Sequence, residues 1–158
     1  MDKLTDIVYF ENSQNKRVVL TSPQNKNYWE IKGRKGFSAP DVDLYSETMA
    51  SGKTIYFGKY IKPRHCSLQM VCKGRTTAER DRLFYDLLET LIDKDSNYEG
   101  RLYLRKSDGA QVYLKCVYEG GMNIEKEYKI FSFFTIDFFA ADPLFYLVSN
   151  PNITFLGV

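Results

Sequence analysis

The most regular pattern of apolar and polar positions lies near the end of the chain, between Tyr128 and Tyr146, where six of the eleven phenylalanines occur. Most residues of one parity in this segment are apolar, and a period of two is typical of a strand with one face against a core. We predict that the segment is the central strand of the fold. Pro143 closes it, because proline has no amide hydrogen to donate to a ladder. The predicted inward set is Ile130, Phe134, Ile136, Phe138 and Ala140.

The opposite parity of this segment is mixed in character. Phe131 and Phe133 are apolar, whereas Thr135 and Asp137 are polar. We interpret the two phenylalanines as buried against another layer or another subunit, and Asp137 as exposed to water. The second face of the predicted strand therefore changes from covered to solvated along its length.

Shorter apolar runs predict further strands, and the turn residues between them predict hairpins. Asp108-Gly109 supplies the positive backbone angles of a tight turn between two of these runs. Val71 falls on the outward parity of another run. The predicted strands cover residues 6–11, 17–21, 28–31, 55–61, 66–73, 100–105 and 111–118. Their predicted core residues are Cys66, Leu68, Met70, Cys72, Leu102, Leu104, Val112, Leu114 and Cys116.

The period changes to that of a helix in residues 77–93. Thr76 and Glu79 stand at the spacing of a capping box, which satisfies amides of the first helical turn. Apolar residues recur at helical intervals and predict a face that lies on the sheet, while charged residues, Arg80 among them, predict a face in water. The apolar face consists of Leu83, Phe84, Leu87, Leu88, Leu91 and Ile92.

Two stretches lack a sustained pattern. We interpret residues 119–127 as a loop that leads into the central strand, and residues 41–54 as a long loop with isolated apolar side chains. A long irregular segment in a compact domain is usually functional or mobile. Because a monomer offers no evident place to bury these side chains, we expect residues 41–54 to reach a neighbouring subunit.

The composition indicates one domain of the all-β or α+β class, and the predicted helix favours a β-rich α+β domain. The chain has 158 residues, of which 44% are apolar and 15% aromatic, which suits a core built without disulfides or metals and favours strands. A net charge of +2 without a basic run is too small to argue for nucleic-acid or membrane binding. The chain begins without a secretory signal and has no run of about 18 uncharged apolar residues, so we expect it to be made and assembled in the cytosol.

Residue types that carry chemistry are present, but not in catalytic arrangements. Cys66 and Cys72 lie on one predicted strand, about 20 Å apart, and cannot form a disulfide, so all three cysteines are expected to be reduced. His65 points to the opposite face from Cys66, which disfavours a nucleophile and base pair. The SGKT sequence at residues 51–54 lacks the earlier glycine of a phosphate-binding loop. We expect no catalytic site, no metal site and no cofactor.

Two alternatives from other functional classes remain open. A hydrolase would need paired carboxylates in a cleft, and carboxylates such as Asp41 and Asp43 are scattered along the chain. A single-stranded nucleic-acid binder could stack bases on the aromatics that alternate with lysine in residues 56–62. A basic cluster on one face would favour the binder.

The order of the elements resembles a known family. A strand with Trp29 precedes a loop rich in glycine and proline, then come Gly52, a strand preceded by Arg64, one helix, a hairpin and an aromatic strand that ends FFAADPLFY. This order resembles the N-terminal domain of distal tail proteins of long-tailed bacteriophages and prophages. The residues that match its pattern most specifically are Asp142, Pro143 and Tyr146.

The resemblance implies a β-sandwich-like core with one flanking α-helix and a long loop or hairpin arm. Residues 1–147 would form this distal-tail-type domain. Residues 148–158 would be a C-terminal tail or the start of a second domain, which many members of the family carry. The expected fold class is therefore α+β and β-rich.

The resemblance further implies a structural virion protein and not an enzyme. In the family, six copies form a ring that is a hub at the distal end of the tail, with a central channel for DNA. The expected partners are other copies of the chain in a homohexamer, the tail-tube protein, the tail-tip or other tail-associated baseplate protein, and the tape-measure protein. The chain would belong to the virion and be assembled in the bacterial host. A tail-tube or tail-completion subunit is the alternative within this class.

The residues expected at the contact between subunits are apolar. They lie on the predicted long loop, on the strand after it, and on the outer parity of the central strand. They are Leu44, Tyr45, Met49, Tyr56, Phe57, Phe131 and Phe133.

Overall fold

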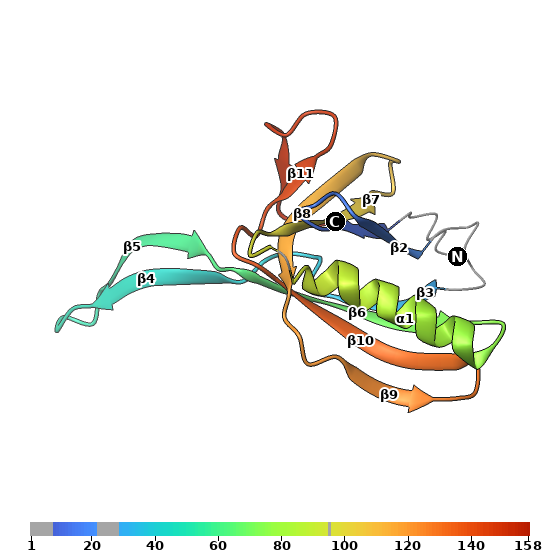
Figure 1. Ribbon diagram of the computed structural model, residues 1–158. Helices are drawn as coiled ribbons and strands as arrows, with labels where there is room; N and C mark the ends of the chain where they lie inside the picture. The colour runs from blue at the N-terminus through green and yellow to red at the C-terminus, as the bar shows by residue number, and fades with distance from the viewer. Residues whose placement is uncertain (1–7, 22–28, 95) are drawn as a thin grey trace.

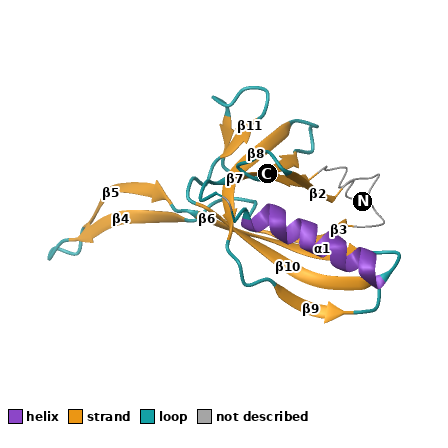
Figure 2. Cartoon of the chain, in the orientation of Figure 1, coloured by secondary structure: helices purple, strands orange, loops and turns teal. Residues whose placement is uncertain are grey.

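The computed structural model describes residues 8–21, 29–94 and 96–158. Its main sheet folds into two layers, with one helix, α1 (Thr77–Ile92), packed between them, and a two-stranded arm extends away to one side (Figures 1 and 2). The predicted β-rich α+β class is confirmed. Residues 6, 7 and 28, at the ends of two predicted strands, lie outside the described part of the chain.

Within each layer neighbouring strands are antiparallel, and hydrogen bonds between strands connect the two layers into one continuous sheet. In the first layer the order is β2-β1-β7-β8, followed by a short hairpin, and in the second it is β3-β6-β10-β9. The end of β10 pairs with β8 and so joins the layers. The first layer contains β1 (Val8–Glu11), β2 (Arg17–Thr21), β7 (Gly100–Arg105), β8 (Gln111–Tyr118), β11 (Phe145–Leu147) and β12 (Thr154–Phe155). The second contains β3 (Trp29–Lys35), β6 (Arg64–Lys73), β9 (Asn123–Glu127) and β10 (Phe131–Ala140).

The core lies where the inward faces of the two layers and α1 meet. Phe138 of the second layer stacks on Phe10 of the first with ring centroids 5.6 Å apart, and Phe84 of α1 packs edge-on against Phe134 at 5.0 Å. The core residues predicted from the strand segments are buried, and so is most of the predicted inward set of the central strand. These buried residues are Cys66, Leu68, Met70, Cys72, Leu102, Leu104, Val112, Leu114, Cys116, Phe134, Ile136, Phe138 and Ala140.

The central strand is β10, which is shorter than the predicted segment. Ile130 precedes it, and Tyr146 belongs to β11 in the other layer. The chain turns between the layers at Asp142-Pro143, where the Asp142 side chain accepts a hydrogen bond from the amide of Leu144 at 3.2 Å. Pro143 therefore lies in the connection after the strand, and the apolar residues beyond it continue the pattern in a different strand.

Asp137 was predicted to be exposed, and the structure corrects this. It pairs with Ser67 across the β10–β6 ladder, and the Ser67 hydroxyl donates a hydrogen bond to its carboxylate at 2.5 Å. The side chain is half-buried as a result. Neighbouring strands supply such partners, and a single strand pattern does not indicate them.

The capping of α1 is confirmed in its main feature. The side chain of Thr76 accepts a hydrogen bond from the amide of Glu79 at 3.1 Å, while the Glu79 carboxylate accepts one from the amide of Arg75 at 2.8 Å. At the other end Asp93 has a left-handed backbone, with φ of 45°. Its carboxylate accepts a hydrogen bond from the Ser13 hydroxyl at 2.5 Å, which ties the end of the helix to the β1–β2 turn.

Three expectations near this helix were wrong. Residues 119–127 are not a loop throughout, because Asn123–Glu127 form β9 along the edge of β10. Arg80 is not in water but 6% exposed. Its guanidinium pairs with Asp81 and with Glu127 of β9, both at 2.8 Å. Ile92, assigned to the apolar face, is exposed.

No helix in the described part of the chain is long and apolar enough to cross a membrane.

The register of β10 gives a test by mutation. Phe134→Ala should lower the free energy of unfolding by about 3–5 kcal/mol, because it leaves a cavity among Trp29, Phe84 and the core. Asp137→Ala should lower it by about 0.5–1.5 kcal/mol, the usual net value of one hydrogen bond. Urea denaturation of both variants measures the difference. Equal losses would contradict the assignment of Phe134 to the inner face.

Candidate interaction surfaces

The arm is the first candidate surface. It consists of β4 (Val42–Thr48) and β5 (Thr54–Ile61), which pair with each other in a two-stranded sheet separate from the main sheet. At its tip the amide of Gly52 donates to the carbonyl of Met49 at 2.8 Å, and Gly52 has a φ of 81° that favours glycine. In Figure 1 the arm points away from the layers. Residues 41–54 are thus mostly one half of a hairpin and not the irregular loop that was predicted.

The reason for the missed strand is that neither face of the arm is covered. Leu44 is 66% exposed and Phe57 is 64% exposed. A strand with both faces in water has no inner face, so apolar and polar residues need not alternate along it. The exposed apolar residues of the arm are Val42, Leu44, Tyr45, Met49, Ile55, Tyr56, Phe57, Tyr60 and Ile61.

The register divides the arm into two different faces. Residues opposite each other in an antiparallel pair lie on the same face, and residues alternate between faces along a strand. A bulge between Tyr45 and Ser46 shifts the pairing. One face carries two carboxylates and no lysine from the two strands, and the other carries Lys59. The first, which we call the acidic face, consists of Asp43, Tyr45, Glu47, Ile55 and Tyr60.

Contacts within the arm stiffen its acidic face. Tyr45 and Tyr60 stack with centroids 5.5 Å apart. The Tyr60 hydroxyl donates to the Asp43 carboxylate at 2.7 Å, and this hydrogen bond raises the pKa of Tyr60. These few contacts are a weak basis for stability, because an isolated two-stranded hairpin is marginal in water. The arm therefore has the properties of an element that is completed by a partner.

The root of the arm is fixed by Arg64, the first residue of β6. Its side chain is 4% exposed, and burial lowers the pKa of its guanidinium. The guanidinium donates to the carbonyls of Gly36 and Ser38, both at 2.6 Å, to that of Pro143 at 3.1 Å, and to that of Leu156. It also lies over the ring of Phe145, with 4.9 Å to the centroid. We call this arrangement the arginine clasp.

The arginine clasp joins Arg64 to three other parts of the chain that are distant in sequence, of which Pro143 is one. Gly36 and Ser38 precede the arm, Arg64 follows it, and Leu156 lies near the end of the chain. Beside the clasp, the Tyr146 hydroxyl donates to the Asp142 carboxylate, and this hydrogen bond raises the pKa of Tyr146 to about 12. The structure thus brings Arg64 and the Asp-Pro stretch of the family pattern to one place, whereas Trp29 lies in the core and Gly52 at the tip of the arm.

The C-terminal residues also pack on the domain. After β11 the chain turns back into β12, and the amide of Val158 donates to the carbonyl of Phe37 at 2.9 Å. Residues 148–158 therefore lie against the first layer and the segment before the arm.

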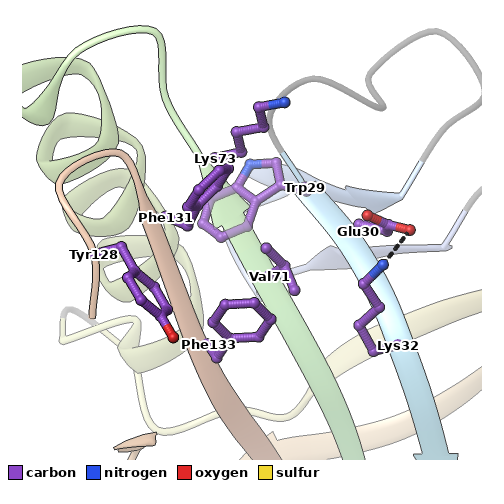
Figure 3. Close-up of a pocket in the computed structure, with 8 residues that line it drawn as sticks. All are labelled: Trp29, Glu30, Lys32, Val71, Lys73, Tyr128, Phe131 and Phe133. Atoms are coloured by element: carbon purple, nitrogen blue, oxygen red, sulfur yellow. Dashed lines mark hydrogen bonds and ion pairs between the residues drawn. The ribbon is translucent and has the colours of Figure 1, made fainter. Parts of the chain in front are cut away.

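The second candidate surface is a groove on the outer face of the second layer, shown in Figure 3. It has a volume of about 380 Å³. Tyr128, just before β10, packs edge-on against Phe131 and Phe133 with centroids 6.3 and 6.1 Å away. The lining residues are Trp29, Glu30, Lys32, Val71, Lys73, Tyr128, Phe131 and Phe133.

The groove accounts for two differences from the sequence-based prediction. Val71, on the outward parity of β6, is only 7% exposed, and Phe131 and Phe133 are half-buried. These side chains cover one another on a face that would otherwise be solvated. Of the expected subunit-interface residues, Phe131 and Phe133 lie in the groove, and the other five, Leu44, Tyr45, Met49, Tyr56 and Phe57, lie on the arm. Sequence reasoning missed Tyr128 and Lys73, because the groove combines residues from several strands.

The outer face of the first layer is different, because its aromatic rings are covered by side chains of the same layer. Tyr9, Tyr103, Tyr113 and Tyr146 form a continuous stack with centroids 4.4, 5.6 and 5.4 Å apart. Cationic side chains lie over three of these rings at 4.8 to 5.1 Å. The three cations are Arg17, Arg101 and Lys115.

The titratable side chains show no arrangement suited to catalysis among the residues described. No group of three or more His, Cys, Asp and Glu side chains gathers there as a metal site would require. The three cysteines are free and buried, and burial raises the pKa of Cys66 and of Cys72 to about 12. His65 is exposed, and its Nδ1 lies 2.6 Å from Oε1 of Glu119. What the geometry offers is apolar and charged surface for binding.

Comparison with known proteins gives a match in structure only. No protein-family model matches the chain, and no curated protein matches it. The crystal structure of the Dit protein of phage SPP1, described as a paradigm of the hub adsorption apparatus in phages that infect Gram-positive bacteria, aligns with a TM-score of 0.62 over 89% of this chain. The chain has a Dit-type fold. The resemblance to distal tail proteins is thereby confirmed at the level of the fold.

Two baseplate structures show the same Dit-type fold. A chain of the phage p2 baseplate in its activated conformation with strontium aligns with a TM-score of 0.61 over 84% of this chain, and one of the phage P2 baseplate with calcium aligns with 0.60 over 84%. The sequence identities are 15% to SPP1 Dit, and 13% and 11% to the baseplate chains. This chain spans 52% of the SPP1 Dit chain and 43% of each baseplate chain, so about half their length.

The arginine clasp gives a second test of the structure. Arg64→Lys keeps the positive charge but cannot supply the fork of donors that reaches four carbonyls, so we expect the free energy of unfolding to fall by roughly 1–3 kcal/mol. Arg105→Lys, an exposed position on β7, is the matched control and should change stability by less than about 0.5 kcal/mol. Urea denaturation measures both. A stable Arg64→Lys variant would contradict the assigned role of the guanidinium.

Proposed function

We propose that the chain is a structural protein of a phage tail, and that it forms a ring-shaped hub at the distal end of the tail. The observation that supports this most directly is the Dit-type fold, which covers 89% of the chain in the alignment with SPP1 Dit. In this proposal the chain acts by assembly and not by catalysis. It joins the tail tube to the tail-tip or baseplate proteins, with other copies of itself as its first partners.

The arm supports ring formation. Exposed apolar side chains in this number on one element usually mark an interface, and obligate interfaces are more apolar than the rest of a protein surface. A head-to-tail contact uses two different patches and either closes into a ring or continues as a filament. An arm that extends from one side of a subunit supplies one such patch. We propose a homohexamer, as in the family that the sequence resembles.

The ring would place its two axial surfaces against different partners. One would meet the tail-tube protein and the other the tail-tip or tail-associated protein, while the tape-measure protein and the DNA would occupy the channel. The lumen should be polar and not strongly basic, because a basic lumen would hold the phosphates of passing DNA. Assembly would take place in the bacterial host, and the product would be part of the virion. The packed C-terminal segment 148–158 would be the place from which a second domain continues in longer proteins of this fold.

A tail-tube or tail-completion subunit is the alternative within the same class. Both would associate in rings, but tube subunits stack repeatedly along the axis, whereas a hub ends at one ring or at two rings face to face. The size of the assembly therefore separates the two functions.

The central test is the mass of the purified chain in solution. We expect light scattering on a size-exclusion column to give a hexamer or a pair of hexamers, and negative-stain images to show a central opening. Tubes of increasing length would favour the tail-tube alternative. A monomer whose mass does not depend on concentration would contradict the hub.

The contribution of the arm can be tested by removing it. The amide of Lys62 donates to the carbonyl of Asp41 at 2.9 Å, so the two ends of the arm lie together and a short glycine linker can replace residues 42–61. The shortened chain should keep its circular dichroism spectrum and unfold cooperatively, because the arm pairs only with itself. Its mass in solution should fall to that of one chain. Rings that persist without the arm would remove the arm from the contact between subunits.

A further inference from the structure

The positions of the arm and the groove in one subunit exclude a contact between them within that subunit. Arg64, at the start of β6, is three residues beyond the end of the arm, whereas Lys73, at the other end of β6, lines the groove. Nine residue steps in a strand separate them by about 30 Å. The arm extends away from that end of the layer (Figure 1). Any contact between arm and groove must therefore join two copies of the chain, with a different patch from each.

The groove is apolar at its base and mainly basic at its edge. Val71, Phe131 and Phe133 lie together there, as Figure 3 shows. Glu30 is the one carboxylate among the lining residues, and it is paired with Lys32 at 2.7 Å. The Lys73 ammonium lies over the Phe131 ring, 5.7 Å from its centroid.

A third lysine extends this basic edge. Lys126 of β9 pairs with Phe133 in the ladder, so it projects from the same face of the layer. The groove thus offers aromatic surface bordered by Lys32, Lys73 and Lys126. Glu125, in the bulge beside Lys126, lies on the same side, where its carboxylate accepts a hydrogen bond from the Thr135 hydroxyl at 3.2 Å.

The acidic face of the arm has complementary chemistry. It presents the stacked rings of Tyr45 and Tyr60, with Asp43 and Glu47 on either side along β4. Within the two strands it carries no lysine or arginine, because Lys59 lies on the opposite face. Lys62, the residue after β5, lies 3.6 Å from the Asp43 carboxylate. Asp43 is therefore partly neutralised within its own subunit, and the net negative charge of the face comes from Glu47. Aromatic surface between carboxylates matches aromatic surface between lysines, and such complementarity fixes orientation and suppresses wrong pairings.

From these observations we infer that the acidic face of the arm of one subunit docks in the groove of the next. The inference rests on the proposed ring and identifies the patch that receives the arm. It makes the contact heterologous, as ring closure requires. The first layer is not the receiving surface, since its tyrosine rings are already covered by Arg17, Arg101 and Lys115.

Two defective variants of the full chain test the docking. In the groove variant, Phe133→Ser removes an aromatic ring that receives the arm. In the arm variant, Tyr45→Ser with Glu47→Lys removes a ring and reverses a charge on the acidic face. Each variant alone should have the mass of a single chain. An equimolar mixture should form a 1:1 heterodimer and nothing larger, because only one intact arm and one intact groove can meet.

Matched controls separate docking from a loss of folding. Phe139→Ser changes the same residue type on the same strand and the same face, but outside the groove, and should leave the ring intact. Tyr85→Ser, on the exposed side of α1, should do the same, since Tyr85 is 68% exposed and Tyr45 is 56% exposed. Tyr128→Ala is a second groove variant outside the strands and should reproduce the effect of Phe133→Ser.

The outcomes distinguish this inference from the proposed function. If the wild-type chain forms rings and the groove variants form them equally well, the docking is wrong and the hub stands. If the mixture remains monomeric while the wild type forms rings, the arm does not meet the groove. If the arm variant is monomeric while the groove variant associates alone, the arms contact each other. A monomeric wild type overturns both the ring and the docking.

Discussion

The fold depends on the pairing of β10 with three other strands, β6 on one edge and β9 and β8 on the other. This strand pairs along its full length with β6, at its beginning with β9, and at its end with β8. Through these pairings one strand belongs to both layers, and its inward phenylalanines contact both α1 and the opposite layer. The groove is formed on the outer side of the same strand. Core and candidate binding surface are therefore two faces of one element, and the register of β10 against β6 sets both.

The arm obeys no comparable constraint within the subunit. It is joined to the layers by its two ends, which the arginine clasp holds beside the C-terminal segment. Because the guanidinium binds backbone carbonyls, its hydrogen bonds depend on the path of these segments and not on polar side chains there. Gly36 is an exception, since its φ of 82° and its contact with the His65 carbonyl leave no room for a side chain. The two layers can therefore determine where the arm begins, while the residues of the arm itself can vary with the surface that the arm contacts.

The sequence predicted those parts of the fold in which one face is buried. The inward sets of β6, β7, β8 and β10 alternate because they share one core, and α1 repeats at helical intervals for the same reason. The strands β4 and β9 were missed because they are largely exposed, so no inner face imposes a period on them. Asp137 and Arg80 were misplaced because their partners, Ser67 and Glu127, come from other strands.

The candidate site could be predicted only in part. Sequence reasoning identified Leu44, Tyr45 and Met49 as apolar residues without an evident burial place. The division of the arm into two faces was beyond reach, since it depends on a bulge in the pairing of β4 with β5. The groove was beyond reach for another reason. Its lining comes from β3, β6, β10 and the residue Tyr128 before β10, and these segments become neighbours only when the layer forms.

The locality of the arm has a consequence for the kinetics of assembly. Its strands are adjacent in sequence and pair only with each other, so the hairpin can form in microseconds and without help from the slower, long-range pairings of the layers. The strand pairing of the arm can then form before the subunit meets another copy, and a partner adds stabilising contacts to a hairpin that is marginal by itself. No strand has to be exchanged or withdrawn when subunits join. For the proposed ring, the rate of assembly should accordingly follow subunit concentration and diffusional encounter, and folding of the arm should contribute no slow step of its own.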